Sequence, residues 1–160
     1  MILLALGANL PSREGSPRET LRRAGFALEA RGLVIMARSR LFMTEPIPRS
    51  SQPWYVNQVL AVDTTLEPRA LLEQLLAVEQ VFGRRRGERN APRTLDLDLI
   101  LYGDAVIDQP GLIVPHPRFR TRRFVLEPLA EVAAGMRDPV SGRTVRELLG
   151  DLGGGIPGPV

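Results

Sequence analysis

The segment Arg93-Thr94-Leu95-Asp96-Leu97-Asp98-Leu99-Ile100-Leu101-Tyr102 alternates leucine and aspartate behind an arginine, which is the pattern of a β-strand. Successive side chains of a strand point to opposite faces, so the four leucines would share a core face and the two aspartates the other face, with their Cα atoms roughly 7 Å apart. Two adjacent carboxylates repel each other and are costly to desolvate, so we expect a cation between them. Mg²⁺ suits this position, because it binds one or two carboxylates and completes its shell with water and substrate phosphates.

The composition is that of an ordinary globular chain of 160 residues, 44% apolar and 24% charged. We expect a single domain over residues 1–152 and a flexible tail over 153–160. The lack of cysteine excludes disulfides and thiolate metal sites, and no apolar run reaches the roughly 20 residues of a membrane helix. Residues 1–6 lack the basic start of a signal peptide, which favours a cytoplasmic protein. The net charge of +3 suits an anionic ligand but does not by itself indicate nucleic acid.

Hydrophobic periodicity and capping residues predict alternating strands and helices. Up to Tyr102 we expect strands over 1–6, 33–42, 55–65 and 95–102, and helices over 17–31 and 68–82. Ser16, followed by Pro17 and Glu19, is the signature of a helix N-terminus with a capping box. The order βαββαβ is that of a ferredoxin-like α+β fold. Beyond this core we expect a C-terminal hairpin ending near Val114 and additional helices over 121–134 and 145–152.

An arginine-rich loop directly precedes the Asp/Leu strand and carries Arg84, Arg85, Arg86, Arg89 and Arg93. Guanidinium groups are always charged and can bind phosphate oxygens bidentately. Taken singly, the arginines could form a solvated loop and the aspartates a polar outer face. Their adjacency favours phosphoryl transfer, in which a metal and a cationic clamp do most of the work. The chain has no Gly-x-x-x-x-Gly-Lys-Ser/Thr motif, which excludes a P-loop enzyme.

Other candidate residues are more ambiguous when each is considered by itself. His116 is the only histidine and is held between two prolines in a stiff segment. Asn57 lies among apolar residues of a predicted strand, so it must find hydrogen-bond partners. Its amide could fix a neighbouring loop or recognise the edge of a heterocycle. Tyr55 and Phe124, taken singly, fit a hydrophobic core better than a ligand-stacking role.

The stretch Arg89–Ile100 resembles the signature of the 6-hydroxymethyl-7,8-dihydropterin pyrophosphokinase family, which belongs to the folate pathway. Further resemblances follow in the expected order over nearly the whole chain. They are Ala5–Leu10, Thr44–Pro46, Tyr55–Asn57, Val114–Pro117 and Arg122–Leu129. The central signature is highly specific, whereas each flanking piece would be weak by itself.

The resemblance implies transfer of a pyrophosphoryl group from ATP to the hydroxymethyl group of the pterin, with release of AMP. Asp96 and Asp98 would then hold two Mg²⁺ ions, and with Arg84 and Arg93 they would form the catalytic set. The pterin would lie between Tyr55 and Phe124, with its edge bound by Asn57 and by backbone groups of Thr44, Glu45 and Ile47. The positions around the nucleotide would be Glu79, Arg84, Arg93, His116 and Arg122, with backbone groups near Leu99, Leu112 and Ile113 at the adenine.

The chain departs from the family pattern at three points. Asn90 stands where members often have a bulky aromatic residue, and the arginine loop is one residue shorter. Pro117 replaces a side chain that in some members can reach phosphate. Closure of this loop over ATP would therefore use other side chains, and the roles of Arg85, Arg86 and Arg89 stay open.

Two alternatives to an active enzyme remain. A ferredoxin-like RNA-binding module would bind bases on its sheet and phosphates with its arginines. Only 5% of the residues are aromatic, however, and the aspartate pair would repel phosphate in the absence of a metal. The second alternative is an inactive relative that only binds, and the intact aspartate pair argues against it. Mg²⁺-dependent ATP binding, as opposed to salt-sensitive RNA retention, distinguishes an enzyme from the RNA-binding module. We expect ATP and the reduced pterin as small-molecule partners, and neither nucleic acid nor a membrane.

Overall fold

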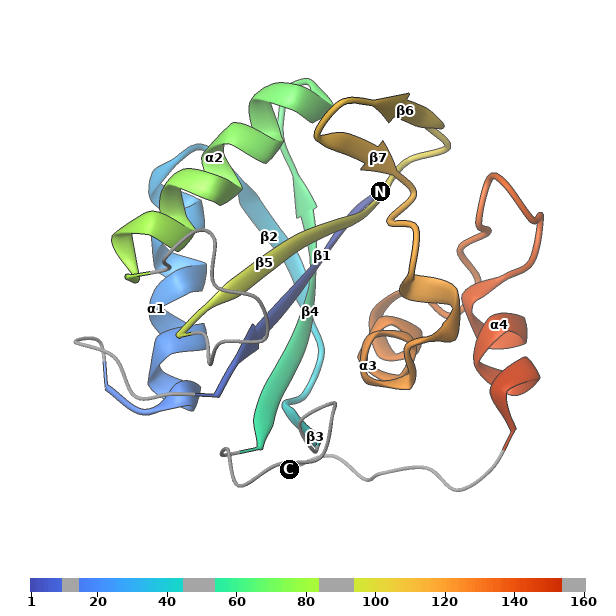
Figure 1. Ribbon diagram of the computed structural model, residues 1–160, viewed down its shortest axis with the longest axis horizontal. Helices are drawn as coiled ribbons and strands as arrows, with labels where there is room; N and C mark the ends of the chain where they lie inside the picture. The colour runs from blue at the N-terminus through green and yellow to red at the C-terminus, as the bar shows by residue number, and fades with distance from the viewer. Residues whose placement is uncertain (10–14, 45–53, 84–93, 154–160) are drawn as a thin grey trace.

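The structure is a computed structural model that describes residues 1–9, 15–44, 54–83 and 94–153. Its main sheet has the order β2-β4-β1-β5, with β3 also paired to β4, and all of these pairings are antiparallel. The strands are β1 (Ile2–Ala8), β2 (Val34–Arg38), β3 (Phe42–Thr44), β4 (Tyr55–Asp63) and β5 (Asp96–Tyr102). With α1 (Pro17–Ala30) and α2 (Pro68–Val81), they form the predicted ferredoxin-like βαββαβ core (Figure 1).

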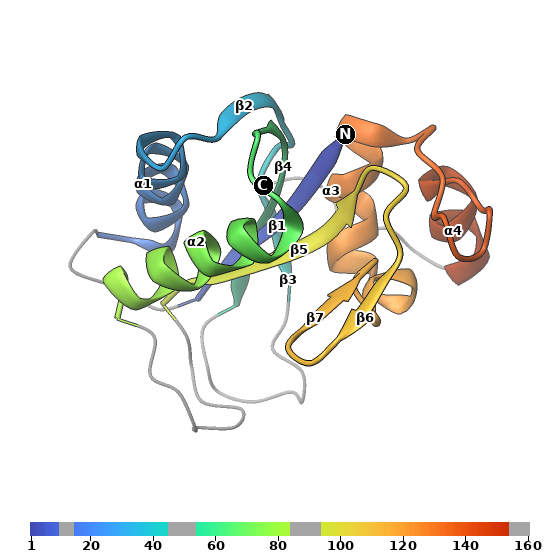
Figure 2. The same ribbon diagram turned by 90° about the horizontal axis from the view of Figure 1, so that it is seen from above.

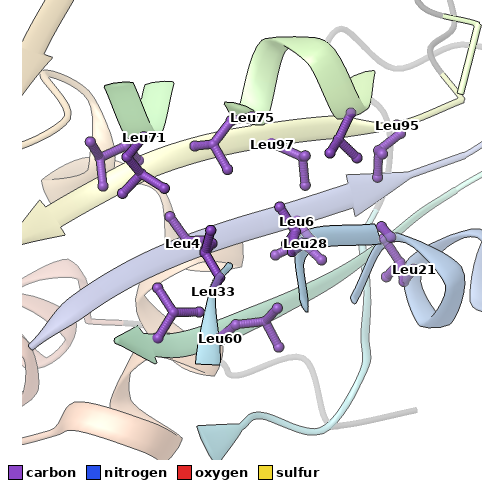
Figure 3. Close-up of a cluster of buried hydrophobic side chains, with 14 of the residues drawn as sticks. Leu4, Leu6, Leu21, Leu28, Leu33, Leu60, Leu71, Leu75, Leu95 and Leu97 are labelled. Atoms are coloured by element: carbon purple, nitrogen blue, oxygen red, sulfur yellow. The ribbon is translucent and has the colours of Figure 1, made fainter. Parts of the chain in front are cut away.

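Helices α1 and α2 cover one face of the sheet (Figures 1 and 2). Apolar residues at helical spacing meet every second residue of β1, β4 and β5 in a leucine-rich core. Figure 3 shows this cluster, which includes Leu4, Leu6, Leu28, Leu75 and Leu97. At the N-terminus of α1 the predicted N-cap is present, since Ser16 Oγ accepts the Glu19 N–H at 3.3 Å. The Glu19 carboxylate binds Arg22 instead of serving as the second half of a capping box.

The opposite face of the sheet is covered over part of its area by the C-terminal segments. These are the 3₁₀ turn η1 (Phe119–Thr121), α3 (Arg123–Ala133) and α4 (Val145–Leu152), which lie on the far side from α1 and α2 (Figure 1). They bury a second apolar cluster that includes Leu3, Val59, Leu126 and Leu129. The hairpin β6 (Ile107–Gln109) and β7 (Leu112–Val114) forms a separate two-stranded sheet.

Several predicted boundaries were wrong for identifiable reasons. The strand expected over 33–42 is two strands, because the buried Ser39 interrupts it and its Oγ accepts the Val59 N–H at 2.9 Å. The helix expected over 121–134 is η1 followed by α3, with the extended residue Arg122 between them. The tail over 153–160 lies outside the described residues except for Gly153.

The predicted alternation of the Asp/Leu strand holds for three of its four leucines. Leu95, Leu97 and Leu99 belong to the core under α1 and α2. Leu101 lies in the second cluster, because the pairing of β1 with β5 is irregular between Leu3 and Leu4. Leu3 pairs with Leu101 and Leu4 pairs with Leu99, so β5 has one extra residue between these two pairs. Because of this extra residue, the side chains at the end of β5 point to the opposite face from the one that strict alternation predicts.

Candidate active site

A row of three residues crosses the sheet on the face opposite to α1 and α2. Gly7 of β1 pairs with Asn57 of β4 on one side and with Asp96 of β5 on the other. The next row toward the strand interior is Val59, Ala5 and Asp98. Neighbouring strands are about 4.8 Å apart, so the backbones of Asn57 and Asp96 are on the order of 10 Å apart, with a residue lacking a side chain between them. The register therefore sets the amide of Asn57 and the two carboxylates on the same face of the sheet, on either side of a residue without a side chain.

Asp96 and Asp98 are half-buried and point away from the leucine core, as their alternation predicted. Their strand is at the edge of the sheet, so its outer backbone groups need other partners. The carboxylate of Glu79, 1% exposed on α2, accepts the N–H of Leu97 at 2.7 Å, between the two aspartates. Glu79 therefore supports the strand that carries the acidic pair, and this contact could not be inferred from the motif.

The donor set at this place fits Mg²⁺. Among the described residues, no group of three or more His, Cys, Asp or Glu side chains is arranged to hold a metal ion. Asp96 and Asp98 supply two hard oxygen ligands, which is the number that Mg²⁺ takes when water and phosphate oxygens fill its other positions. A Zn²⁺ site would need more protein ligands than this pair provides.

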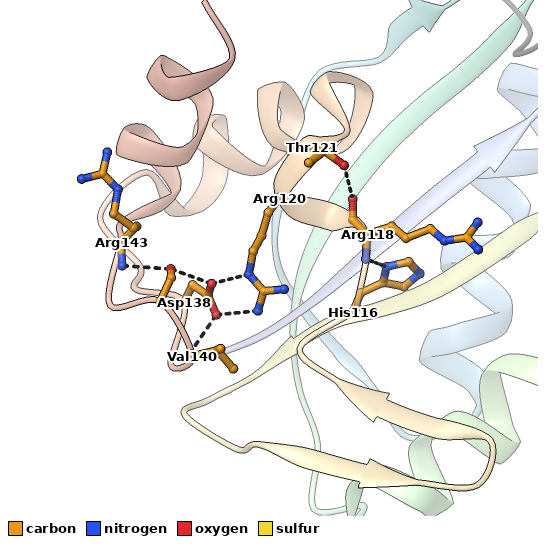
Figure 4. A network of polar contacts seen from close by, with 8 residues as sticks. His116, Arg118, Arg120, Thr121, Asp138, Val140 and Arg143 are labelled. Carbon is orange, nitrogen blue, oxygen red and sulfur yellow. Dashed lines mark hydrogen bonds and ion pairs between the residues drawn. The ribbon is translucent and has the colours of Figure 1, made fainter.

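His116 is fixed beside the acidic strand by two backbone contacts. Its backbone N–H donates to Ile100 O at 2.9 Å. Its ring Nδ1 accepts the backbone N–H of Arg118 at 3.1 Å (Figure 4). The neutral imidazole therefore carries its proton on Nε2. Burial lowers the pKa of His116, Asp98 acts in the opposite direction, and Arg122 and Arg118 lower it further. The side chain is thus neutral at pH 7 and can donate one hydrogen bond from Nε2.

Of the residues predicted to bind the pterin, Thr44, Tyr55 and Asn57 come together where β3 pairs with the beginning of β4. Asn57 is 7% exposed, and its Nδ2 donates to Thr44 Oγ1 at 2.8 Å. Thr44 in turn pairs with Tyr55. Phe124 is in the first turn of α3, where it is half-buried against the second apolar cluster. The guanidinium of Arg122 lies 5.5 Å from the centroid of its ring.

The remaining predicted residues fall into two groups. Of the residues predicted to lie near the adenine, Leu99 and Leu112 are buried and Ile113 is 48% exposed on β7. Residues in two loops lie outside the described part of the chain, so the structure does not place them. They are Glu45, Ile47, Arg84, Arg85, Arg86, Arg89, Asn90 and Arg93.

Motif reasoning did not reveal Gly7, Arg120 or Asp138. Gly7 becomes significant only through the strand register. Asp138 is fully buried and paired with Arg120. Burial acts to raise the pKa of the Asp138 carboxyl, but hydrogen bonds from Arg120, Ser141 and the Val140 N–H outweigh it and hold this pKa at about 2. A lone Asp-Pro dipeptide after a helix gives no signal of such a pair.

The fold and the row Asn57–Gly7–Asp96 define a ferredoxin-like α+β protein with an acidic site on the sheet face opposite to α1 and α2. The profile of the family described as 7,8-dihydro-6-hydroxymethylpterin-pyrophosphokinase (HPPK) matches residues 3–134. The chain belongs to this family.

Individual relatives agree with this family. The 2-amino-4-hydroxy-6-hydroxymethyldihydropteridine pyrophosphokinase of Pseudomonas aeruginosa is 43% identical over 149 residues, which cover 92% of this chain and 89% of that protein. The enzyme of the same name from Bacillus subtilis is 38% identical and covers 81% and 75%. Among solved structures, Plasmodium falciparum HPPK-DHPS (S436F/A437G/A613S triple mutant with SDX-DHP) aligns with a TM-score of 0.73 at 14% identity, over 94% of this chain and 44% of that one. At that identity the likeness concerns the fold alone.

Proposed function

We propose that the protein transfers pyrophosphate from ATP to 6-hydroxymethyl-7,8-dihydropterin, giving the pterin diphosphate and AMP. Membership of the family supports this reaction. The observation that carries the proposal is the row in which Asn57 and Asp96 flank Gly7, because it sets a hydrogen-bonding amide opposite a carboxylate pair on one sheet face. A flat polar heterocycle needs such an edge contact, and a triphosphate needs the cation that the carboxylates attract.

Asp96 and Asp98 would hold two Mg²⁺ ions, which would neutralise charge on the phosphates and make the attacking hydroxyl more acidic. Arg84 and Arg93, which lie outside the described residues, would clamp the phosphates as the predicted catalytic arginines. His116 would donate from Nε2 to a phosphate oxygen and Arg122 would add a positive charge beside it. The adenine would meet backbone groups near Leu99, Leu112 and Ile113, with Glu79 supporting β5 beneath the nucleotide.

On the pterin side, Asn57 would bind the edge of the ring and Thr44 would hold the amide in place through the bond to Nδ2. Tyr55 and Phe124 would contact the two faces of the ring, and backbone groups of Glu45 and Ile47 would complete the edge contacts. Bringing the hydroxyl and the phosphate together in this way would supply most of the acceleration, since the protein has little covalent work to do.

Residues 1–152 would form the single pyrophosphokinase domain. Among the helices that the structure describes, none is long and apolar enough to span a membrane. We propose a cytoplasmic enzyme with ATP and the reduced pterin as its partners and without a nucleic-acid ligand.

The test is a product assay with ATP, Mg²⁺ and the reduced hydroxymethylpterin, run on the wild type and on Asp98→Asn. We expect AMP and the pterin diphosphate from the wild type, no turnover when Mg²⁺ is chelated, and loss of turnover in Asp98→Asn. Asp104→Asn is the matched control, because Asp104 is exposed just beyond the far end of β5. Full turnover by Asp98→Asn, or salt-sensitive RNA retention without turnover by the wild type, would contradict the proposal.

A further inference from the structure

The segment over residues 116–124, here called the arginine arm, carries candidate residues for both substrates. His116 and Arg122 belong to the nucleotide side and Phe124 to the pterin side. The arm begins at the bond from the His116 N–H to Ile100 O and ends in the first turn of α3. Between these points it has a single 3₁₀ turn, held by weak backbone bonds of 3.4 Å from Thr121 N–H and 3.3 Å from Arg122 N–H.

The arm carries four arginines, and two of them have acidic partners among the described residues: Arg120 pairs with Asp138, and Arg123 pairs with Glu127 within α3. Arg120 Nε donates to Asp138 Oδ2 at 2.5 Å and Arg120 Nη2 donates to Asp138 Oδ1 at 3.0 Å (Figure 4). Its guanidinium also lies 4.9 Å from the ring centroid of the fully buried Phe119. Within the described part of the chain, Arg118 and Arg122 form no ion pair with a carboxylate, so their charges suit an anionic ligand.

The carboxylate of Asp138 is held in position independently of the arm. It is fully buried in the connection between α3 and α4, where the Val140 N–H donates to Oδ1 at 3.0 Å and the Ser141 hydroxyl to Oδ2 at 2.7 Å. The backbone of the same residue closes the turn, since its N–H donates to Arg143 O and its carbonyl accepts the Gly142 N–H, each at 2.8 Å. A preformed, desolvated acceptor of this kind fixes a bidentate guanidinium in one orientation.

We propose that Arg120 and Asp138 are positioning residues for nucleotide binding: their ion pair anchors the middle of the arginine arm to the α3–α4 connection and thereby directs His116 and Arg122 toward Asp98. The pair does not touch the ligand in this account. The inference rests on the proposed function for its effect on ATP, whereas its effect on the arm can be measured in the free protein.

Because His116 is the only histidine, its ring protons give an unambiguous NMR signal for the state of the arm. Asp138→Asn keeps the shape of the side chain and removes its charge. We expect the ring-proton signals of His116 to shift and broaden as the arm loosens, because the 3.1 Å bond from the Arg118 N–H that fixes the ring through Nδ1 is then no longer held in one geometry. We also expect ATP, titrated by calorimetry with Mg²⁺, to bind at least about fivefold more weakly, since small displacements of binding groups are costly.

The matched control is Asp151→Asn, which removes the charge of an exposed carboxylate on the neighbouring α4 that accepts a 2.7 Å bond from Arg143. It should leave the His116 signal and ATP affinity unchanged. If Asp138→Asn does not fold, Arg120→Lys carries the test, because lysine keeps the charge and loses the bidentate contact.

An unchanged His116 signal in a folded variant would overturn the inference, whatever the ATP affinity. A shifted His116 signal with unchanged ATP affinity would support the anchoring role and contradict the placement of His116 and Arg122 at the nucleotide. A shift in both supports the inference as stated.

Discussion

Replacing Gly7 by alanine should weaken pterin binding and leave the stability of the protein close to that of the wild type. An ideal Cβ at this position would lie 3.2 Å from Asn57 Oδ1 and 3.9 Å from Val56 O. The first distance is shorter than an ordinary contact between carbon and oxygen by a few tenths of an ångström, so the amide of Asn57 must move. Its Nδ2 is bonded to Thr44 Oγ1 at 2.8 Å, so this movement also strains the contact that orients the amide.

Gly7→Ala affects the stability of the fold and the affinity for the pterin differently. Alanine in a strand interior is favoured over glycine by roughly 0.5–1 kcal/mol, which offsets the strain of the close contact and leaves the stability near that of the wild type. The displaced amide loses about one neutral hydrogen bond to the ligand, on the order of 1 kcal/mol, which corresponds to about fivefold in Kd. The added methyl group also occupies the space between Asn57 and Asp96, so fivefold is a lower bound.

The assay is calorimetric or fluorescence titration with the reduced hydroxymethylpterin in the presence of Mg²⁺ and a non-hydrolysable ATP analogue, together with a thermal melt. Gly150→Ala is the control, since a Cβ there meets nothing within 4 Å and the residue lies on α4, away from the site. Unchanged pterin affinity in a folded Gly7→Ala variant would refute the reasoning, because the row across the sheet would then have no part in binding.

Three further predictions concern the metal site, the buried ion pair and the arginine loop. Asp96→Ala should nearly abolish turnover and leave the melting temperature unchanged or slightly raised, as the side chain points away from the core and its removal relieves repulsion; a clear loss of stability in circular-dichroism melts would contradict this. Asp138→Asn should be less stable than the wild type by about 2 kcal/mol at pH 7, because the folded-state pKa of Asp138, about 2, is below its usual 3.8. In urea titrations this difference should shrink as the pH falls below 3.8 toward 2, since the wild type then loses the stabilisation; a pH-independent difference would argue against it. Arg84→Ala should slow the chemical step in single-turnover kinetics more than it weakens ATP binding, and the reverse order would assign Arg84 to ground-state binding.

Much of the fold follows from local sequence signals. The alternation in residues 95–99 predicted the direction of each side chain, because a buried face and a strand period of two leave one solution. Proline at the first position of α1 and α2 and glycine after each helix marked the ends, and α4 was predicted over its observed range. The errors came where a single residue changed the geometry: Ser39 divides a predicted strand, and the irregular pairing near Leu3 turns Leu101 to the other face.

The site was predictable only as far as its motifs extend. The carboxylate pair and Asn57 could be found from residue type and pattern, but their alignment with Gly7 depends on the register of three strands distant in sequence. The contact of Glu79 with Leu97 joins a helix to an edge strand 18 residues away, and that of Arg120 with Asp138 spans the same separation. Such pairings are set by the packing of whole elements, which no local pattern encodes.

The most direct measurement of the central claim follows the γ-phosphate of ATP. With ATP labelled at the γ position, Mg²⁺ and the reduced hydroxymethylpterin, the account predicts that the label appears in a pterin diphosphate and that the released AMP is unlabelled. Formation of ADP together with a pterin monophosphate would show attack at the γ-phosphorus and would contradict the transfer of pyrophosphate.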